Sequence, residues 1–443
     1  MAKPRNRWIA LTAWLAIWAL LVAALALLMS VPGWMLPALL LPLAAWLFGT
    51  RTGRQAWSAT QVGISTIPQR LGSSSVVVVG IAGVVGVLVA LLAMAAGFAA
   101  TLRQSGSDDT AIVLRAGAQT ELNSVLGHDT VVLVSQQPQV RQTAAGQPIA
   151  SSELVVVAAL PKRSTGLDAN VELRGVGERA WELRPKLRML AGRRFNPGLR
   201  ELIVGKRAQE QFAGVAVGST LKLNGQSWQV VGEFEVGDAT DSDLWGDVDV
   251  VGPTYRRGGS STSVTVQLTD ASAFAAFKAA LATDPRLKVD VKTTRDYFSE
   301  QSAQLTKLIT GLGTAIGLIM AIGAVFGALN SMYAAVAART REIATLRAVG
   351  FRAVPVVVSV MLETMLLATL GGLIGAAIAW LLFDNYTAST LGANFTQIVF
   401  AFQVSPELLW RGLKWALAMG LLGGLFPALR AARMSVTEGL REL

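Results

Sequence analysis

The sequence has no cysteine and a single histidine, and each scarcity excludes a class of chemistry. Without cysteine there is no disulfide, no thiolate nucleophile and no cysteine-ligated metal. A histidine-dependent triad or metal centre would depend on His128 alone, and we expect that residue to lie at the surface in a turn. The 443 residues also lack the Gly-x-x-x-x-Gly-Lys-Ser/Thr motif of a P-loop ATPase. We therefore predict that this chain binds no cofactor and does not hydrolyse ATP itself.

Charge is also scarce, at 15% of residues, whereas 52% are hydrophobic and the mean hydropathy is +0.47. This balance is too apolar for an ordinary soluble globular protein and predicts an integral membrane protein. A bilayer core of about 30 Å needs roughly 20 apolar residues as helix. The sequence predicts four such transmembrane spans, at residues 76–100, 307–338, 353–383 and 408–430.

Residues 1–50 are predicted to form a further apolar hairpin. The first run follows basic residues, as a signal peptide would, but it has no clear small-residue cleavage site, and a second run follows at once. The second run contains Pro37 and Pro42, so the hairpin is either two spans or one span and a re-entrant segment. Residues 51–75 are predicted to be a cytoplasmic amphipathic segment.

Residues 101–306 differ from the rest, because short β-rich stretches alternate there with turn residues. Asn224-Gly225 between two such stretches predicts a β-hairpin. Helical patterns interrupt the region at 205–212 and 271–282. We predict a polytopic α-helical membrane protein with an inserted extracytoplasmic α+β domain that is divided into two lobes.

Charge predicts the sidedness of each part. Residues 101–306 contain 23 basic and 23 acidic residues, so the net charge of +10 belongs to the remainder. An excess of Lys and Arg marks cytoplasmic loops, which places the basic clusters and the tail at 431–443 inside, and the domain and a short loop at 384–407 outside. The high pI thus reflects topology rather than nucleic-acid binding. Arg411 and Lys414, at the outer start of the last span, run against the rule, and snorkelling to the headgroups would explain them.

The most informative segment is residues 339–352, a charged helix-forming stretch between two apolar runs. Ile343, Leu346 and Val349 or Gly350 recur at helical spacing, while the arginines and Glu342 offer polar contacts. We expect an amphipathic helix at the cytoplasmic surface. Docking on another protein is favoured over a helix that merely lies among anionic lipid headgroups.

Four stretches together resemble a permease of the MacB/FtsX type, the mechanotransmission class of ABC transporters, over about residues 76–443. They are the span 76–100 with Ala111-Ile-Val-Leu-Arg-Ala-Gly117; Gly192-Arg-Arg-Phe195 with Glu201-Leu-Ile-Val204 and residues 217–232; Arg339-Thr-Arg-Glu-Ile-Ala-Thr-Leu-Arg-Ala-Val-Gly350 with Glu363 and Gly371-Gly372-x-x-Gly375; and Gly424-Leu-Phe-Pro-Ala-Leu-Arg-Ala-Ala-Arg433. The hairpin at residues 1–50 is additional to the usual four spans of the family.

The resemblance implies that residues 339–352 are a coupling helix on which a separate ABC ATPase subunit docks, two copies per transporter, each holding ATP-Mg. The coupling residues would be Arg339, Arg341, Glu342, Ile343, Leu346, Arg347 and Gly350. It further implies a bacterial inner-membrane location with the large domain in the periplasm, a second permease copy, lipid contacts, and a periplasmic adaptor with an outer-membrane channel.

The implied function is to couple ATP hydrolysis to motion of the periplasmic domain, for export or extraction of a hydrophobic compound, peptide or lipoprotein. One alternative is FtsX-like signalling that activates a periplasmic cell-wall hydrolase. Another is a membrane-anchored periplasmic enzyme or sensor, with Asp238, Asp241, Asp243, Asp247 and Asp249 as a cation site. Their spacing does not fit an EF-hand, so we expect a solvated acidic loop.

Glu363 is the only charge in the third span. Eleven residues of helix place it roughly 16 Å beyond Arg352, near mid-bilayer, where we expect no second ionisable group beside it. It should therefore face the helix bundle, as a structural hydrogen-bonding group or as part of a conformational switch. Glycines at four-residue spacing recur in the spans and predict close helix approach, within the chain or at a dimer face. They are Gly313 with Gly317, Gly323 with Gly327, Gly371 with Gly375, and Gly420 with Gly424.

Overall fold

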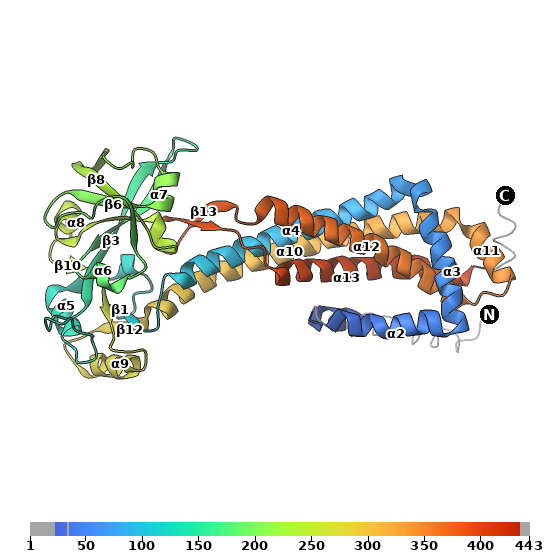
Figure 1. Cartoon of the computed structure of the whole chain (residues 1–443), viewed down its shortest axis with the longest axis horizontal. Coiled ribbons are helices and arrows are strands. Elements are labelled where there is room, and N and C mark those ends of the chain that lie inside the picture. Colours follow the sequence, from blue (N-terminus) through green and yellow to red (C-terminus); the bar gives the residue numbers. More distant parts are fainter. Residues whose placement is uncertain (1–22, 33–34, 435–443) are drawn as a thin grey trace, which may run out of the picture. The chain divides into compact units, whose positions relative to one another are not determined.

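A computed structural model describes residues 23–32 and 35–434 of the chain (Figure 1). It divides into two compact units. The membrane unit contains the chain up to Met94, Ile309–Asn385 and the chain from Gln403 onward. The outer unit contains Ala95–Leu308 and Tyr386–Phe402.

Four helices are long and apolar enough to cross a membrane: α4 (Leu71–Gln104, preceded by a short 3-10 turn), α10 (Thr294–Ala338), α12 (Ala353–Phe383) and α13 (Pro406–Arg433). They confirm the polytopic fold class. Two of them extend beyond the uncharged runs of the sequence, since α4 begins at Leu71 and α10 at Thr294. Capping explains the early start of α10, because the Thr293 hydroxyl accepts a bond from the Asp296 amide, 3.0 Å away.

The N-terminal part of the membrane unit consists of shorter helices. Residues 23–30 are helical, α2 spans Leu36–Gly49, and α3 spans Arg51–Ser65. At 1.5 Å per residue, α2 is about 21 Å long, which is short of a bilayer core. Thr50 separates α2 from α3 and caps the latter, its hydroxyl accepting from the Gly53 amide. The part of the predicted hairpin before residue 23 lies outside the described residues.

Small residues let the long helices approach within the chain. A Cβ at Gly375 of α12 would lie 2.4 Å from the Ala82 carbonyl oxygen of α4, and one at Gly420 of α13 would lie 2.5 Å from the Ala368 Cβ of α12. These glycines therefore serve intramolecular packing. Figure 1 shows α12 and α13 running alongside each other, with α11 (Thr340–Ala348) near one end of the pair.

The outer unit is built on a ten-stranded mixed sheet in the order β12-β1-β11-β3-β4-β9-β6-β8-β5, with β7 paired to β8. Its strands are β1 (Thr110–Arg115), β3 (Ala150–Pro161), β4 (Asp168–Val176), β5 (Arg188–Gly192), β6 (Glu201–Gly205), β7 (Thr220–Leu223), β8 (Gln226–Glu235), β9 (Leu244–Asp247), β11 (Ser263–Gln267) and β12 (Val289–Thr293). A small pair, β2 (Leu126–Gly127) and β10 (Ser260–Ser261), stands apart.

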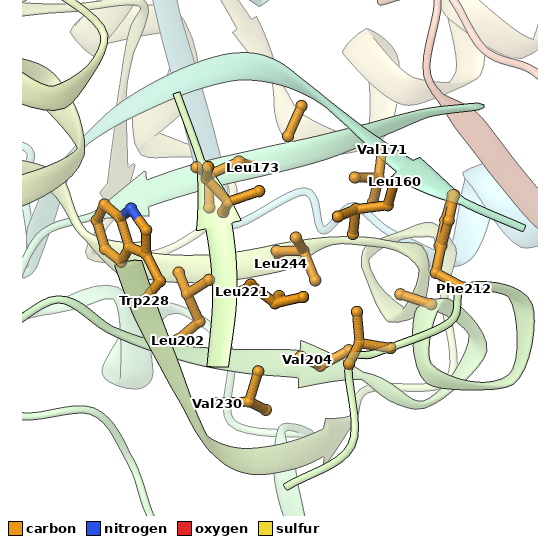
Figure 2. Close-up of a cluster of buried hydrophobic side chains, with 14 of the residues drawn as sticks. Leu160, Val171, Leu173, Leu202, Val204, Phe212, Leu221, Trp228, Val230 and Leu244 are labelled. Carbon is orange, nitrogen blue, oxygen red and sulfur yellow. The ribbon is translucent and has the colours of Figure 1, made fainter. Parts of the chain in front are cut away.

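Short helices accompany the sheet: α5 (His128–Ser135), α6 (Ala180–Leu183), α7 (Lys206–Gln211), α8 (Val248–Thr254) and α9 (Ala273–Thr283). Two main apolar clusters lie along the sheet. One is built around Trp228, Leu202 and Leu244 (Figure 2). The other contains Val113, Val266 and Phe277. Smaller clusters lie around Trp245 and Phe234 and around Tyr297 and Ile112, so the core of the outer unit is divided among several apolar clusters.

The predicted hairpin at Asn224-Gly225 is present between β7 and β8. Both turn residues have positive φ, 45° and 78°, as a type I′ turn requires. Residues 384–407, expected to be only a short loop, contain a second hairpin, β13 (Thr387–Leu391) paired with β14 (Gln397–Ala401). This hairpin belongs to the outer unit. Its threonines and β-branched residues favour extended backbone, which length and hydropathy alone did not reveal.

Candidate functional site

Glu363 forms two ion pairs in the membrane unit. Its Oε1 lies 2.5 Å from Nη2 of Arg70, and its Oε2 lies 3.0 Å from Nη1 of Arg339. Its side chain is 2% exposed, and those of the two arginines are 14% and 13% exposed. The expectation of a carboxylate with no ionisable neighbour is therefore wrong. The arginines stand outside the uncharged runs of the sequence, and only folding brings their long side chains to Glu363.

Three chain segments converge at this ion cluster, which we define as Arg70, Arg339 and Glu363. Arg70 ends the 3-10 turn Ile67–Arg70 that leads into α4, Arg339 is the N-cap of α11, and Glu363 lies on α12. Helix α3 passes close by, since a Cβ at Gly63 would lie 2.9 Å from Glu363 Oε2. Charge-assisted bonds to both carboxylate oxygens fix the relative positions of these segments.

Helix α11 presents two different faces. Ile343 is buried, Leu346 is half-buried, and both line a cavity of about 20 Å³ together with the ion cluster. That volume has room for about one water molecule. Arg347 donates to the Met434 carbonyl. Of the residues predicted to couple, Arg339, Ile343, Leu346 and Arg347 therefore make contacts within this chain.

The opposite face of α11 is exposed: Arg341, Glu342, Thr345, Ala348 and Val349. These positions recur at intervals of three and four residues, so they share one side of the helix. Val349 is 76% exposed, although it is a large apolar residue. Gly350, with φ of +106°, ends the helix in a backbone conformation that favours glycine. Helical spacing predicts the periodicity of Ile343 and Leu346, and the structure turns both of these side chains toward the helix bundle.

The outer unit contains a second charged cluster, buried around Arg174 of β4. The Arg174 guanidinium contacts carboxylate oxygens of Glu121 at 2.9 Å, Glu153 at 2.7 Å and Glu172 at 2.6 Å. Arg184 makes a further pair with Glu153 at 2.8 Å. Burial works to raise the pKa of Glu153, but the charges of Arg184 and Arg174 outweigh it and hold that pKa below its usual value.

The aspartates expected to form a solvated acidic loop belong in part to this buried region. Asp238, Asp241, Asp243 and Asp247 are all buried, so that expectation is wrong. Burial, with the negative charge of Glu172, raises the pKa of Asp243 well above its usual range. Asp241 accepts bonds from the amides of Val236 and Gly237. Across residues 23–32 and 35–434, no group of three or more His, Asp or Glu could hold a metal ion.

The β13–β14 hairpin is fastened to the outer unit by polar contacts. Asn394 donates to Glu172 at 3.1 Å, Arg207 donates to the Val399 carbonyl at 2.7 Å, and the Val399 amide donates to the Ser242 hydroxyl at 3.0 Å. Phe400 is fully buried and packs edge-to-face on Phe98, with ring centroids 5.5 Å apart. His128, by contrast, lies exposed at the start of α5, where the sequence had placed it at the surface.

Four helices long and apolar enough to cross a membrane, an inserted α+β unit and a charged helix between two of the four define a polytopic membrane protein with an inserted domain. Two family descriptions match the chain: MacB-like periplasmic core domain at residues 74–284 and FtsX-like permease C-terminal at residues 314–436. The chain belongs to the MacB/FtsX-type ABC transporter permeases.

Individual relatives are similar in sequence over part of their length. The chain is 26% identical over 291 residues to the macrolide export ATP-binding/permease protein MacB 1 of Aeromonas hydrophila, covering 60% of this chain and 42% of that protein. It is 25% identical over 311 residues to the macrolide export ATP-binding/permease protein MacB of Pasteurella multocida, covering 64% of this chain and 45% of that protein. It thus spans less than half the length of these relatives.

Solved structures give weaker similarities. The periplasmic region of MacB from Actinobacillus actinomycetemcomitans aligns with a TM-score of 0.35 at 14% identity, covering 46% of this chain and 95% of that one. The extracellular domain of the noncanonic ABC-type transporter YknZ from Gram-positive bacteria aligns with a TM-score of 0.32 at 17% identity, covering 42% of this chain and 100% of that one.

Proposed function

We propose that this chain is a permease subunit that couples ATP hydrolysis by a separate ABC ATPase to motion of its outer unit. The single observation that carries the proposal is the two-faced helix α11. Its inner face contacts the ion cluster, and its outer face exposes Arg341, Glu342, Thr345 and Val349. A surface helix with one face bound to the bundle and one free can pass a partner's movement to the helices behind it.

The ion cluster supports this route for force. A push on α11 acts on Arg339, which is bonded to Glu363 of α12, and Glu363 is bonded to Arg70 just before α4. Helix α4 continues to Gln104, ahead of β1, and α12 leads into the β13–β14 hairpin. The movement of two membrane helices would thus reach the outer unit along the chain itself.

The complete assembly would contain two ATPase copies holding ATP-Mg and a second permease copy, in a bacterial inner membrane with the outer unit in the periplasm. Its work would be export or extraction of a hydrophobic compound, a peptide or a lipoprotein, with a periplasmic adaptor and outer-membrane channel as further partners. The names of the relatives, which include macrolide export, support an export function.

The test is to purify the full chain with the ATPase that associates with it and to measure ATP hydrolysis. Val349→Asp places a charge in the exposed face of α11, and we expect about a tenfold or greater loss of ATPase binding, as for an anchor residue in an interface. The control is Thr165→Asp, at an exposed site of the outer unit.

The control should bind the ATPase as the unchanged chain does. Equal binding by Val349→Asp and the unchanged chain would contradict docking on this face. An ATPase whose activity is the same with and without the permease would contradict the coupling proposal as a whole.

A further inference from the structure

The two cationic residues that run against the charge rule, Arg411 and Lys414, are not used by the proposed coupling. Snorkelling does not describe Lys414, because this residue is only 9% exposed. Its Nζ donates to the Met29 carbonyl at 2.8 Å and lies 5.9 Å from the centre of the Trp410 ring. Met29 is in the last turn of the helix at residues 23–30, where carbonyl groups and the helix dipole favour a cation.

A cavity of about 410 Å³ adjoins these two residues in the membrane unit. This volume falls within the range typical of small-molecule sites. Its walls come from the helix at residues 23–30 and from α4, α10 and α13. The lining residues are Met29, Leu88, Leu92, Thr310, Thr314, Glu407, Arg411, Lys414 and Trp415. Apolar side chains thus meet charged ones in a single cavity.

The charge of the lining is positive by one unit, because two cations face one carboxylate. Glu407 is bonded to Arg411 at 2.7 Å. Among the described residues, no carboxylate forms an ion pair with Lys414, whose ammonium has three donors and gives one to Met29. A buried cation without a counter-charge is costly in a membrane, and an anion bound in the cavity would remove that cost.

Lys414 lies eight residues after Pro406, about 12 Å along α13 from its start. That start is joined to the outer unit, which ends at Phe402. The cavity is therefore at the depth of the outer leaflet. Thr314, Glu407 and Arg411 are exposed, so the cavity is accessible from its surroundings.

We propose that this cavity binds one anionic phospholipid of the outer leaflet. The headgroup phosphate would accept bonds from Arg411 and Lys414, and an acyl chain would lie along Leu88, Leu92 and Trp415. The same lipid would bridge α13 and the helix at residues 23–30, which the family motifs do not include. The proposal does not depend on ATPase coupling.

The experiment uses the purified full chain, stripped of lipid in detergent and titrated with phosphatidylglycerol, with bound lipid counted by native mass spectrometry. We expect one tightly bound phosphatidylglycerol per chain and at least tenfold weaker binding of phosphatidylcholine, which has no net charge. Arg411→Gln combined with Lys414→Gln should weaken phosphatidylglycerol binding about tenfold or more, because charge-assisted bonds are lost. Lys307→Gln, an exposed cation outside the cavity, is the matched control and should leave binding unchanged.

Arg411→Gln alone keeps the bond from Lys414 to Met29, so weaker binding in this variant cannot result from release of the helix at residues 23–30. Unchanged binding in both variants would overturn the proposal. Equal affinity for phosphatidylcholine would overturn the role of charge. Binding of inorganic phosphate with the same affinity would identify a site for a free anion and overturn the assignment to a lipid.

Discussion

At the scale of single residues, the ion cluster shows how a charge becomes acceptable inside a helix bundle. The sequence reveals Glu363 as an isolated charge in an apolar run and predicts that it faces the bundle. It gives no indication of the two arginines, which are 293 and 24 residues away along the chain. Only their side-chain reach and the packing of α3, α11 and α12 decide the pairing.

We expect Glu363→Gln to lower the free energy of unfolding by about 3 kcal/mol, because it leaves two largely buried guanidinium groups without a carboxylate. Glu342→Gln is the matched control. Glu342 also pairs with Arg339, at 3.1 Å, but its side chain is half exposed, so its loss should cost below about 1 kcal/mol. Unfolding of the purified chain by denaturing detergent measures both, and equal losses would contradict the burial argument.

A second prediction at this scale concerns pH and Asp243. Its raised pKa means that the folded chain holds a proton that the unfolded chain releases above about pH 3.8. The free energy of unfolding therefore falls as pH rises from that value toward the folded pKa. Asp243→Asn removes this dependence, so the variant should gain stability relative to the unchanged chain between pH 5 and pH 8.

Glu153 should behave in the opposite way. Its lowered pKa stabilises the fold above its ordinary value of 4.5, and this stability is lost as pH falls through the folded pKa. Glu153→Gln should therefore cost about 3 kcal/mol at pH 7, because Arg184 loses its carboxylate. Pulse proteolysis in urea, scored on the outer unit, measures Asp243→Asn at pH 5 and pH 8 and Glu153→Gln at pH 7. A difference between Asp243→Asn and the unchanged chain that stays constant with pH would refute the assignment.

At the scale of elements, α11 and the β13–β14 hairpin are the two segments for which the structure adds most to the sequence prediction. For α11, hydrophobic periodicity predicted the helix, since periodicity is a local property. The face that α11 buries depends on what packs against it, so only the structure shows that Ile343 and Leu346 line the cavity beside the ion cluster. The hairpin was missed because hydropathy along residues 384–407 shows only that the chain leaves the membrane.

We expect Asn394→Ala to loosen the hairpin. Asn394 donates to the buried Glu172, and the substitution removes that bond while Glu172 keeps Arg174. Hydrogen exchange at residues 397–401 should become about tenfold faster, which corresponds to a local loss of about 1.4 kcal/mol. Exchange in β1, elsewhere in the outer unit, should be unaffected. Asn196→Ala, at an exposed asparagine between β5 and β6, provides the control, and similar exchange in both variants would contradict the docking role of Asn394.

At the scale of the whole molecule, the charge distribution makes a direct prediction about sidedness. The chain has no cysteine, so any introduced cysteine reports on one position only. Ser164→Cys, exposed in the outer unit, should react with a membrane-impermeant maleimide in intact spheroplasts. Thr345→Cys, exposed on α11, should react only after the membrane is permeabilised. Labelling of both cysteines, or of neither, in intact spheroplasts would contradict the topology.

The sequence by itself determined the membrane class, the four long helices, the inserted α+β domain, the hairpin at Asn224-Gly225 and the family. Each depends on a local pattern: hydropathy over about 20 residues, alternation in strands, turn chemistry or a contiguous motif. The tertiary structure alone decided the partners of Glu363, the outward face of α11, the burial of the acidic run and the docking of the β13–β14 hairpin. These features depend on contacts between residues far apart in the chain, and a linear pattern of polarity does not encode which distant side chains meet.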